Sequence, residues 1–122
     1  MLIIKRGYDF CKWLLNHSNK FPKSHRFSVA VKLENAMLDF LEMTTIANMQ
    51  KDKVPCLRKA DEALARLRLF LRLSFELKFI NMQSYEYGSR QMAELGRLLG
   101  GWIKKPGIQI AQTSEVSKTS EV

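Results

Sequence analysis

Residues 55–80, PCLRKADEALARLRLFLRLSFELKFI, carry the pattern that decides the fold. Apolar side chains in this stretch recur at helical spacing, so at about 100° per residue they fall in one broad arc. The residues of this arc are Leu57, Ala60, Leu64, Leu67 and Leu71, with Ala63, Phe70 and Ser74 beside them. The stretch therefore predicts an amphipathic helix that buries a wide apolar stripe.

The opposite face of this helix is basic and apolar at once. Its cations are Arg58, Lys59, Arg66, Arg68 and Arg72. Leu69 and Leu73 lie among them, where a helix with a single buried face would have polar side chains. The pattern indicates a helix that packs on its own domain through one face and presents the other face to a partner.

Before this stretch, the sequence predicts two further helices. The first covers residues 6–18, and its inner side consists of Tyr8, Cys11, Leu14 and Leu15. The second covers residues 24–50, with Ser24 as its N-cap and Phe21 as an apolar staple. One seam of the second helix consists of Phe27, Ala30, Leu33, Met37, Phe40, Leu41 and Thr44. A second seam of Val31, Leu38 and Thr45 requires another neighbour, either a helix of the same domain or another subunit.

A fourth helix is expected over residues 82–104, with Asn81 as its N-cap. Its inner face consists of Tyr85, Gly88, Met92, Leu95, Leu99 and Trp102. Its glycines are Gly88, Gly96, Gly100 and Gly101. Each is about 1 kcal/mol worse than alanine in a helix, so we expect close approach of a neighbouring helix to offset the difference. The alternative for the Gly100-Gly101 pair is fraying of the helix end.

Four amphipathic helices joined by short connections predict an all-α, antiparallel up-down-up-down four-helix bundle. We expect residues 1–104 to form this bundle as a single domain. Residues 105–122 contain little apolar mass and a near repeat, TSEVSKTSEV, which is typical of a disordered tail.

The net charge of the chain is +8, from 20 Lys and Arg against 12 Asp and Glu. Such an excess favours a polyanionic partner through long-range attraction. No block of five like charges occurs, which indicates a folded basic surface and not a basic arm. The alternative is a small basic protein whose charge has no specific purpose.

The sequence contains no arrangement typical of catalysis. Its carboxylates form no paired constellation and no Glu-x-x-His motif. The glycines of GRLLGG, residues 96–101, follow no strand and so do not indicate a phosphate loop. His17 and His25 have no ligands at metal spacing, and Cys11 and Cys56 read as reduced core or boundary residues. We expect no catalytic residue, cofactor or metal, no membrane span, and a cytoplasmic location.

Nucleic-acid binding has better support. The candidate phosphate contacts are Arg66, Arg68, Arg72, Arg90 and Arg97. Guanidinium groups bind phosphate well, and no base-reading motif such as a helix-turn-helix or an RRM is present. The residues therefore permit contact with an RNA or DNA backbone by shape and charge, with a solvated basic face as the alternative.

Three segments occur in an order and at a spacing that are similar to one known family. They are FPKSHRF (residues 21–27), LRLFLRL (residues 67–73) and GRLLGGWI (residues 96–103). With them, residues 8–104 resemble the accessory variability determinant (Avd) proteins of diversity-generating retroelements. These belong to a wider four-helix-bundle family that includes the ribosomal intervening-sequence proteins.

The resemblance implies a non-catalytic accessory protein that forms a pentameric, barrel-like ring with a basic surface. It would bind the retroelement's reverse transcriptase and template RNA and support mutagenic reverse transcription. Arg68 and Arg72 match basic positions of the family's third helix, which implies that they contact the polymerase or nucleic acid. Leu69 and Leu73 become candidates for contact with a neighbouring subunit or partner. The alternative is a structural or scaffolding oligomer with an incidental basic surface.

Overall fold

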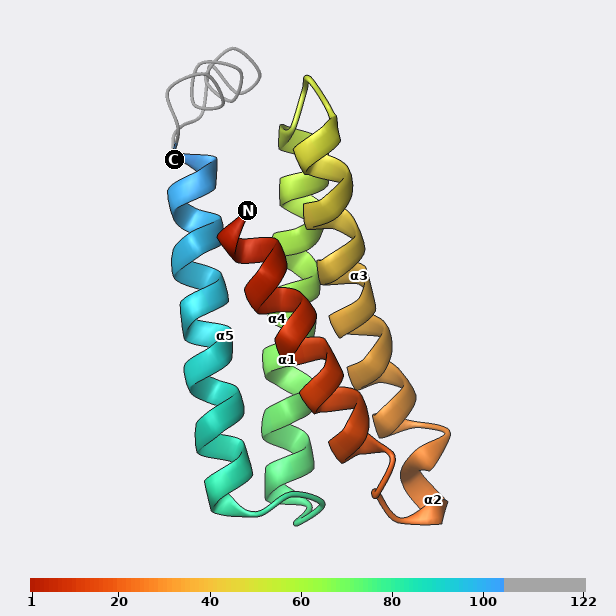
Figure 1. Cartoon of the computed structure of the whole chain (residues 1–122). Helices are drawn as coiled ribbons and strands as arrows, with labels where there is room; N and C mark the ends of the chain where they lie inside the picture. The colour runs from red at the N-terminus through yellow and green to blue at the C-terminus, as the bar shows by residue number, and fades with distance from the viewer. Residues whose placement is uncertain (105–122) are drawn as a thin grey trace.

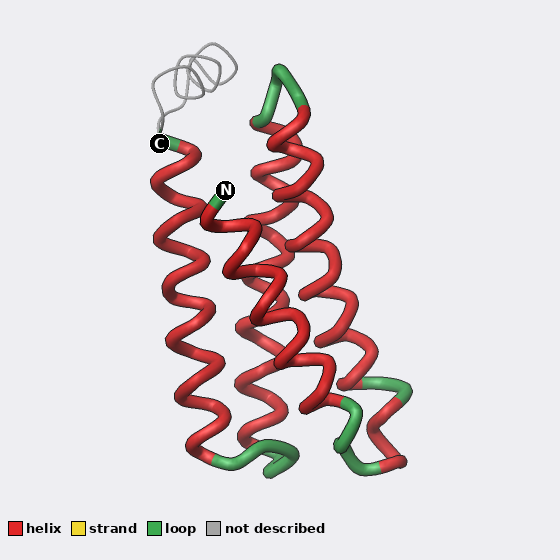
Figure 2. Tube along the Cα trace, in the orientation of Figure 1, coloured by secondary structure: helices red, strands yellow, loops and turns green. Residues whose placement is uncertain are grey.

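The computed structural model describes residues 1–104, which form an all-α structure (Figure 1). Its helices are α1 (Leu2–Ser18), α2 (Lys23–Arg26), α3 (Val29–Met49), α4 (Val54–Glu76) and α5 (Met82–Ile103). Four of them are long, and α2 is a single turn. Short loops join them, and no residue of the described range lies in a strand (Figure 2). The tail predicted for residues 105–122 lies outside the described residues.

The four long helices form one bundle. Helix α3 packs against α4, α4 against α5, α5 against α1, and α1 against α3. Each long helix therefore has two neighbours, and consecutive long helices run in opposite directions (Figure 1). The antiparallel up-down-up-down four-helix bundle predicted from the sequence is confirmed.

Helix α4 supplies the stripe on which the bundle packs. Leu57, Leu64, Leu67 and Leu71 are each at most 1% exposed, and Ala60, Ala63 and Ser74 are fully buried. Each leucine buried in this way stabilises the fold by about 1.5–3 kcal/mol. Phe70 is half-buried at the edge of the stripe. The predicted inner face of this helix is therefore confirmed, although the helix ends at Glu76 and not at Ile80.

Helix α1 begins earlier than predicted, but most of its predicted inner face is confirmed, since Cys11 and Leu14 are buried and Leu15 packs against the core. Gly7 occupies the inward position that faces α3, where a Cβ would lie 3.6 Å from side-chain atoms of Phe40 and Leu41. Tyr8 is one residue further around the helix and is 54% exposed, so the prediction that it faces inward is wrong. Its ring instead lies 5.1 Å from the Lys12 ammonium.

The predicted helix over residues 24–50 is in fact two helices. The chain breaks at Ser28, where φ is −125° and ψ is −84°, so α2 and α3 are not continuous. Phe27 shares the spacing of the α3 seam but lies before the break, and it is 87% exposed. The prediction that Phe27 is buried is therefore wrong. Ser24 lies inside α2 and is not an N-cap, because Pro22 holds that position.

Helix α5 begins as predicted. The Asn81 carboxamide oxygen accepts a hydrogen bond from the Ser84 backbone N–H at 2.8 Å, which caps the helix. Its buried residues are Gly88, Met92, Leu95, Leu99 and Trp102. Tyr85, predicted for the same face, is half-buried and stacks on Phe75 of α4.

Candidate nucleic-acid interface

Arg68 lies on the flank of α4 that faces α5. A Cβ placed on Gly96 of α5 would lie 2.6 Å from Arg68 Nη2 and 3.6 Å from Leu64 Cδ2. Real Cβ atoms do not approach other atoms as closely as the first of these distances. The guanidinium therefore lies against the α5 backbone, at a place where only glycine leaves room for it.

A second glycine of α5 shows the same close approach. A Cβ on Gly88 would lie 2.7 Å from Leu71 Cδ2. For Gly88 and Gly96, the prediction that glycines allow a neighbouring helix to come close is confirmed. For Gly100 and Gly101 it is wrong, since nothing lies within 4 Å of a Cβ at either position.

Arg72 follows Arg68 by one helical turn, so both side chains leave the same flank of α4. The Arg72 Nε donates a hydrogen bond to Glu76 Oε2 at 3.0 Å, and both side chains are mostly exposed. The hydrogen bond to Glu76 raises the pKa of Arg72 above its ordinary value. Arg72 therefore stays fully charged and is oriented along the helix.

Arg66 lies on the other flank of α4. Its Nη2 donates to Asp39 Oδ2 of α3 at 3.0 Å. This places Arg66 at the boundary between α3 and α4, away from the α5 side that holds Arg68. The structure therefore does not bring all five candidate arginines into one patch.

Arg97 and Arg90 lie on the exposed face of α5, seven residues apart and hence on the same side. Arg97 forms two hydrogen bonds to Glu94, of 3.1 and 2.7 Å. Glu94 also lies 3.4 Å from Arg6 Nη1 of α1. The hydrogen bond from Arg97 is the main reason that the pKa of Glu94 is lowered. Within residues 1–104, Arg68 and Arg90 are the candidate arginines that form no ion pair.

The leucines singled out in α4 differ in exposure. Leu69 is 60% exposed, whereas Leu73 is half-buried. On α3, the second seam faces outward as well, since Val31 is 37% and Leu38 45% exposed. We call Val31, Leu38 and Leu69 the outer apolar surface. No helix of the described bundle covers it.

Two cations near this interface were missed by reasoning from sequence. Arg6 reaches Glu94 only because α1 packs against α5, and no local pattern indicates that contact. Lys78 follows α4 with a φ of 66°, although no glycine or proline marks a turn at that point. The turn at Lys78 is recognised only from the backbone hydrogen bonds that end α4, which the sequence does not show.

Residues 1–104 contain no group of three or more His, Cys, Asp or Glu side chains able to hold a metal ion. None of the helices in that range is long and apolar enough to cross a membrane. Cys11 is buried, and burial raises the pKa of its thiol.

Comparison with known proteins supports the family resemblance. A family model described as bAvd-like matches residues 1–106, which is most of the chain and includes all of the described bundle. A comparison with curated proteins gives no match. The match extends over every helix and over both arginine-bearing faces, and the fold is the four-helix one that this family predicts. The chain therefore belongs to the bAvd-like family, the accessory variability determinants of diversity-generating retroelements.

Proposed function

We propose that this protein is a non-catalytic accessory subunit that binds the reverse transcriptase and template RNA of a diversity-generating retroelement. The observation that carries the proposal is Arg68, whose guanidinium lies over Gly96 without a carboxylate partner among residues 1–104. Family membership supplies the retroelement context. We call Arg68 and Arg72 the arginine flank of α4.

The arginine flank suits a phosphate backbone. Arg68 is exposed and has no ion pair within the described residues, so its charge is available to a ligand. Arg72 is paired with Glu76, but exposed ion pairs contribute only about 0–1 kcal/mol, so phosphate can displace the carboxylate. Forked guanidinium contacts to phosphate are among the stronger hydrogen bonds in proteins. The flank therefore favours a polyanion that follows α4.

Arg66 and Arg97 are weaker candidates for phosphate contacts, because Asp39 and Glu94 already neutralise their charges. Arg90 has no such partner within residues 1–104 and is a second free cation on the α5 side. A ligand that bridges from α4 to the outer face of α5 would contact Arg68, Arg72 and Arg90.

The partner protein and the oligomer are further parts of the proposal. Leu69 projects between the arginines of α4, so a polymerase surface that meets these arginines would also cover this leucine. Val31 and Leu38, the part of the outer apolar surface that lies on α3, suit contact between subunits, which agrees with the pentameric ring implied by the family resemblance. Light scattering on the full chain tests the ring, which predicts five times the mass of the 14.2 kDa protomer.

The experiment is co-purification with the retroelement's reverse transcriptase, together with binding of its template RNA at low salt. The variant Arg68→Glu/Arg72→Glu is compared with Lys5→Glu/Lys12→Glu, which reverses two exposed cations of α1 instead. Both variants change the net charge equally. We expect the first to lose both partners and the control to keep them. Wild-type protein that binds neither partner, or equal losses in the two variants, would refute the proposal.

The second candidate function is a scaffolding oligomer with an incidental basic surface. The exposure of Val31, Leu38 and Leu69 favours it, because these side chains suit subunit contacts whether or not RNA binds. For this function, Leu38→Glu/Leu69→Glu would abolish assembly, while Arg68→Glu/Arg72→Glu would change nothing. The arginine double variant thus separates the candidates, because only the accessory function predicts that it loses its partners.

A further inference from the structure

The connection between α4 and α5 contains an open pocket of about 560 Å³. It is lined by Phe75, Glu76, Lys78, Phe79, Ile80 and Asn81. The pocket lies at the same end of the bundle as α2, since the α4–α5 connection and α2 are both at the lower end in Figure 1. Its volume falls in the range of about 300–1,000 Å³ that is usual for small-ligand sites. The lining is mainly aromatic and aliphatic, and it includes one cation.

That cation, Lys78, has an unfavourable backbone conformation. The Phe79 N–H donates to the Ser74 carbonyl at 2.8 Å and the Lys78 N–H to the Phe75 carbonyl at 2.9 Å. This pair of bonds closes a helix end that usually has glycine at the position of Lys78. With a φ of 66°, Lys78 is the one non-glycine residue of the described range in the left-handed region. Since glycine would be less strained at this position, the lysine side chain costs stability.

The charge of Lys78 is also not used within the bundle. In the connection between α3 and α4, by contrast, the Lys53 Nζ donates to the carbonyls of Ala47 at 3.0 Å and Gln50 at 2.6 Å. Lys78 has no hydrogen bond or ion pair from its side chain within residues 1–104. Its ammonium is therefore available to a ligand.

The aromatic lining is held from behind by other rings. Phe79 packs against Phe21 and His25, with ring centroids 5.3 and 4.8 Å apart. Phe75 stacks on Tyr85 at 4.4 Å with planes 6° apart. Both phenylalanines are only half-buried, so each keeps an accessible surface. Fixed but accessible rings are what base stacking requires.

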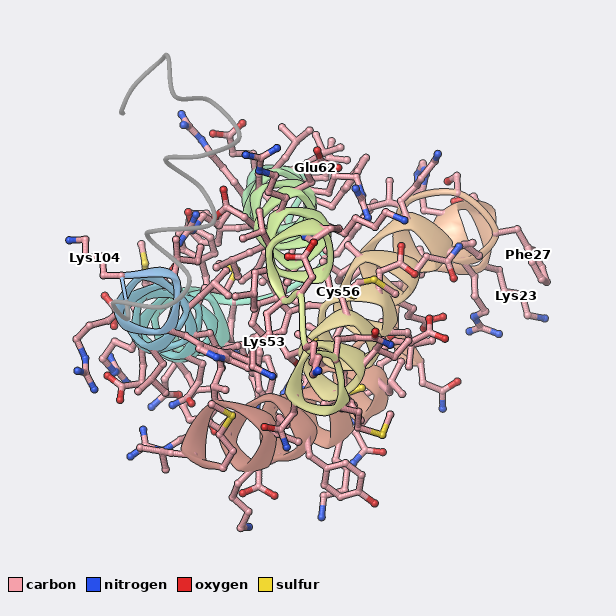
Figure 3. All side chains as sticks on the ribbon, turned by 90° about the horizontal axis from the view of Figure 1, so that it is seen from above. Lys23, Phe27, Lys53, Cys56, Glu62 and Lys104 are labelled. Carbon is pink, nitrogen blue, oxygen red and sulfur yellow. The ribbon has the colours of Figure 1, made fainter. Side chains whose placement is uncertain are left out.

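The pocket adjoins the arginine flank of α4 on one side and α2 on the other. Glu76, the one acidic residue of the lining, is paired with Arg72, which makes the pocket continuous with the arginine flank of α4. On the other side, His25 of α2 touches Phe79, and the same helix carries Lys23, which projects away from the bundle (Figure 3). A nucleic-acid backbone that follows the arginine flank would thus reach the aromatic pocket and its one lysine, Lys78.

We propose that this pocket binds an unpaired nucleobase of single-stranded RNA, with the base against Phe75 or Phe79 and the Lys78 ammonium on an adjacent phosphate. The inference rests on the proposed RNA binding and adds a site for a base to what is otherwise backbone contact. Aromatic stacking accepts any base, so the site selects single strands over duplexes and not one sequence over another.

The test measures binding of a short oligouridine, of a ribose-phosphate chain of equal length without bases, and of a duplex. We expect the full-length protein to bind oligouridine more tightly than either other probe. The variant Lys78→Gly should weaken oligouridine binding by about fivefold, the usual scale of one lost contact. It should also raise Tm, by about 2–5 °C, because glycine relieves the strained backbone. The matched control Lys51→Gly, in the α3–α4 connection, should weaken binding by less than about twofold.

A second measurement does not depend on any variant. Ultraviolet cross-linking of 4-thiouridine-containing oligouridine to the wild-type protein should map to residues 75–81. Cross-links only elsewhere, or equal affinity for the chains with and without bases, would overturn the inference while leaving backbone binding by Arg68 and Arg72 intact. The inference would also be overturned if Lys78→Gly lost binding to the reverse transcriptase but kept binding to oligouridine. The pocket would then be a contact site for that protein. If the wild type binds no RNA of any kind, the proposed function itself fails.

Discussion

Arg66 and Arg68 are two residues apart on the same helix, yet their surroundings differ. Arg66 leaves the flank of α4 that faces α3, where its Nη2 lies 3.0 Å from Asp39 Oδ2. Arg68 leaves the flank that faces α5, where its guanidinium meets Gly96. Identical side chains on one helix are thus compensated on one side and uncompensated on the other.

The difference comes from what the neighbouring helix offers. Helix α3 presents a carboxylate to α4, whereas α5 presents a glycine that allows close approach and supplies no charge. An arginine beside a glycine keeps its charge for a ligand, which favours the binding of a polyanion.

The largest expected effect concerns two leucines of α4, one buried beneath the arginine flank and one exposed on the surface. Leu64 is fully buried and lies 3.6 Å from a Cβ at Gly96, whereas Leu69 is 60% exposed. Leu64→Ala should lower the free energy of unfolding by about 2–5 kcal/mol through the cavity it leaves. Leu69→Ala should change that of the monomer by less than about 0.5 kcal/mol. Urea unfolding at low protein concentration checks both, and similar values for the two variants would contradict the inward and outward assignment.

Neutralising the two arginines separately tests the comparison itself. Arg68→Gln should weaken RNA binding by about five- to tenfold, since a direct phosphate contact is lost. Arg66→Gln should weaken it by less than about twofold, because at physiological salt a charge beyond about 8 Å is screened. Equilibrium binding at that salt concentration measures both. A larger loss in Arg66→Gln would reverse the roles assigned to the flanks of α4.

A matched pair of glycine substitutions in α5 isolates the position of the Arg68 guanidinium. Gly96→Ala and Gly100→Ala should each stabilise the helix by about 0.5–1 kcal/mol, because Arg68 is a flexible exposed chain that can move aside. Only Gly96→Ala should also weaken RNA binding, by about threefold, since it displaces the guanidinium. Thermal unfolding and RNA binding are measured on the same samples. Equal RNA affinity in the two variants would show that the place of Arg68 over Gly96 is unimportant.

The smallest expected effect is a pH dependence on the outer face of α5. Because Arg97 and Arg6 lower the pKa of Glu94 in the folded state, the ionised carboxylate stabilises the fold above the ordinary glutamate pKa of 4.5. That contribution is lost as pH falls through the lower folded value. The Tm of Glu94→Gln should therefore lie slightly below that of the wild type at neutral pH, and the difference should shrink below pH 4.5. A difference that grows on acidification would contradict this sign.

Much of the fold could be predicted because leucine and alanine repeat in phase along residues 55–80 and pack as one stripe. Helix ends were harder to predict. Phe27 is in phase with α3, but a break at Ser28 turns it outward. The apolar residues after Glu76 continue the pattern, yet the chain turns at Lys78 without a glycine. Periodicity reports which side chains share a face, and it cannot report where the backbone leaves the helix.

The candidate site could be predicted only as a set of exposed arginines. The spacing of Arg66 and Arg68 separates them by about 200° on a helix. The pairing of one with Asp39 and the closeness of the other to Gly96 depend on which helices adjoin, which no local pattern contains. Arg6 likewise reaches Glu94 only through the packing of α1 on α5.

The salt dependence of RNA binding tests most directly the claim that the arginine flank of α4 contacts phosphate. The logarithm of the binding constant is measured against the logarithm of salt concentration for a single-stranded RNA. We predict that Arg68→Ala/Arg72→Ala lowers the magnitude of the slope by about 1.4, as expected for two lost phosphate contacts. The control Lys5→Ala/Lys12→Ala should leave the slope unchanged. Equal slopes for the wild type and the Arg68/Arg72 variant would contradict the account.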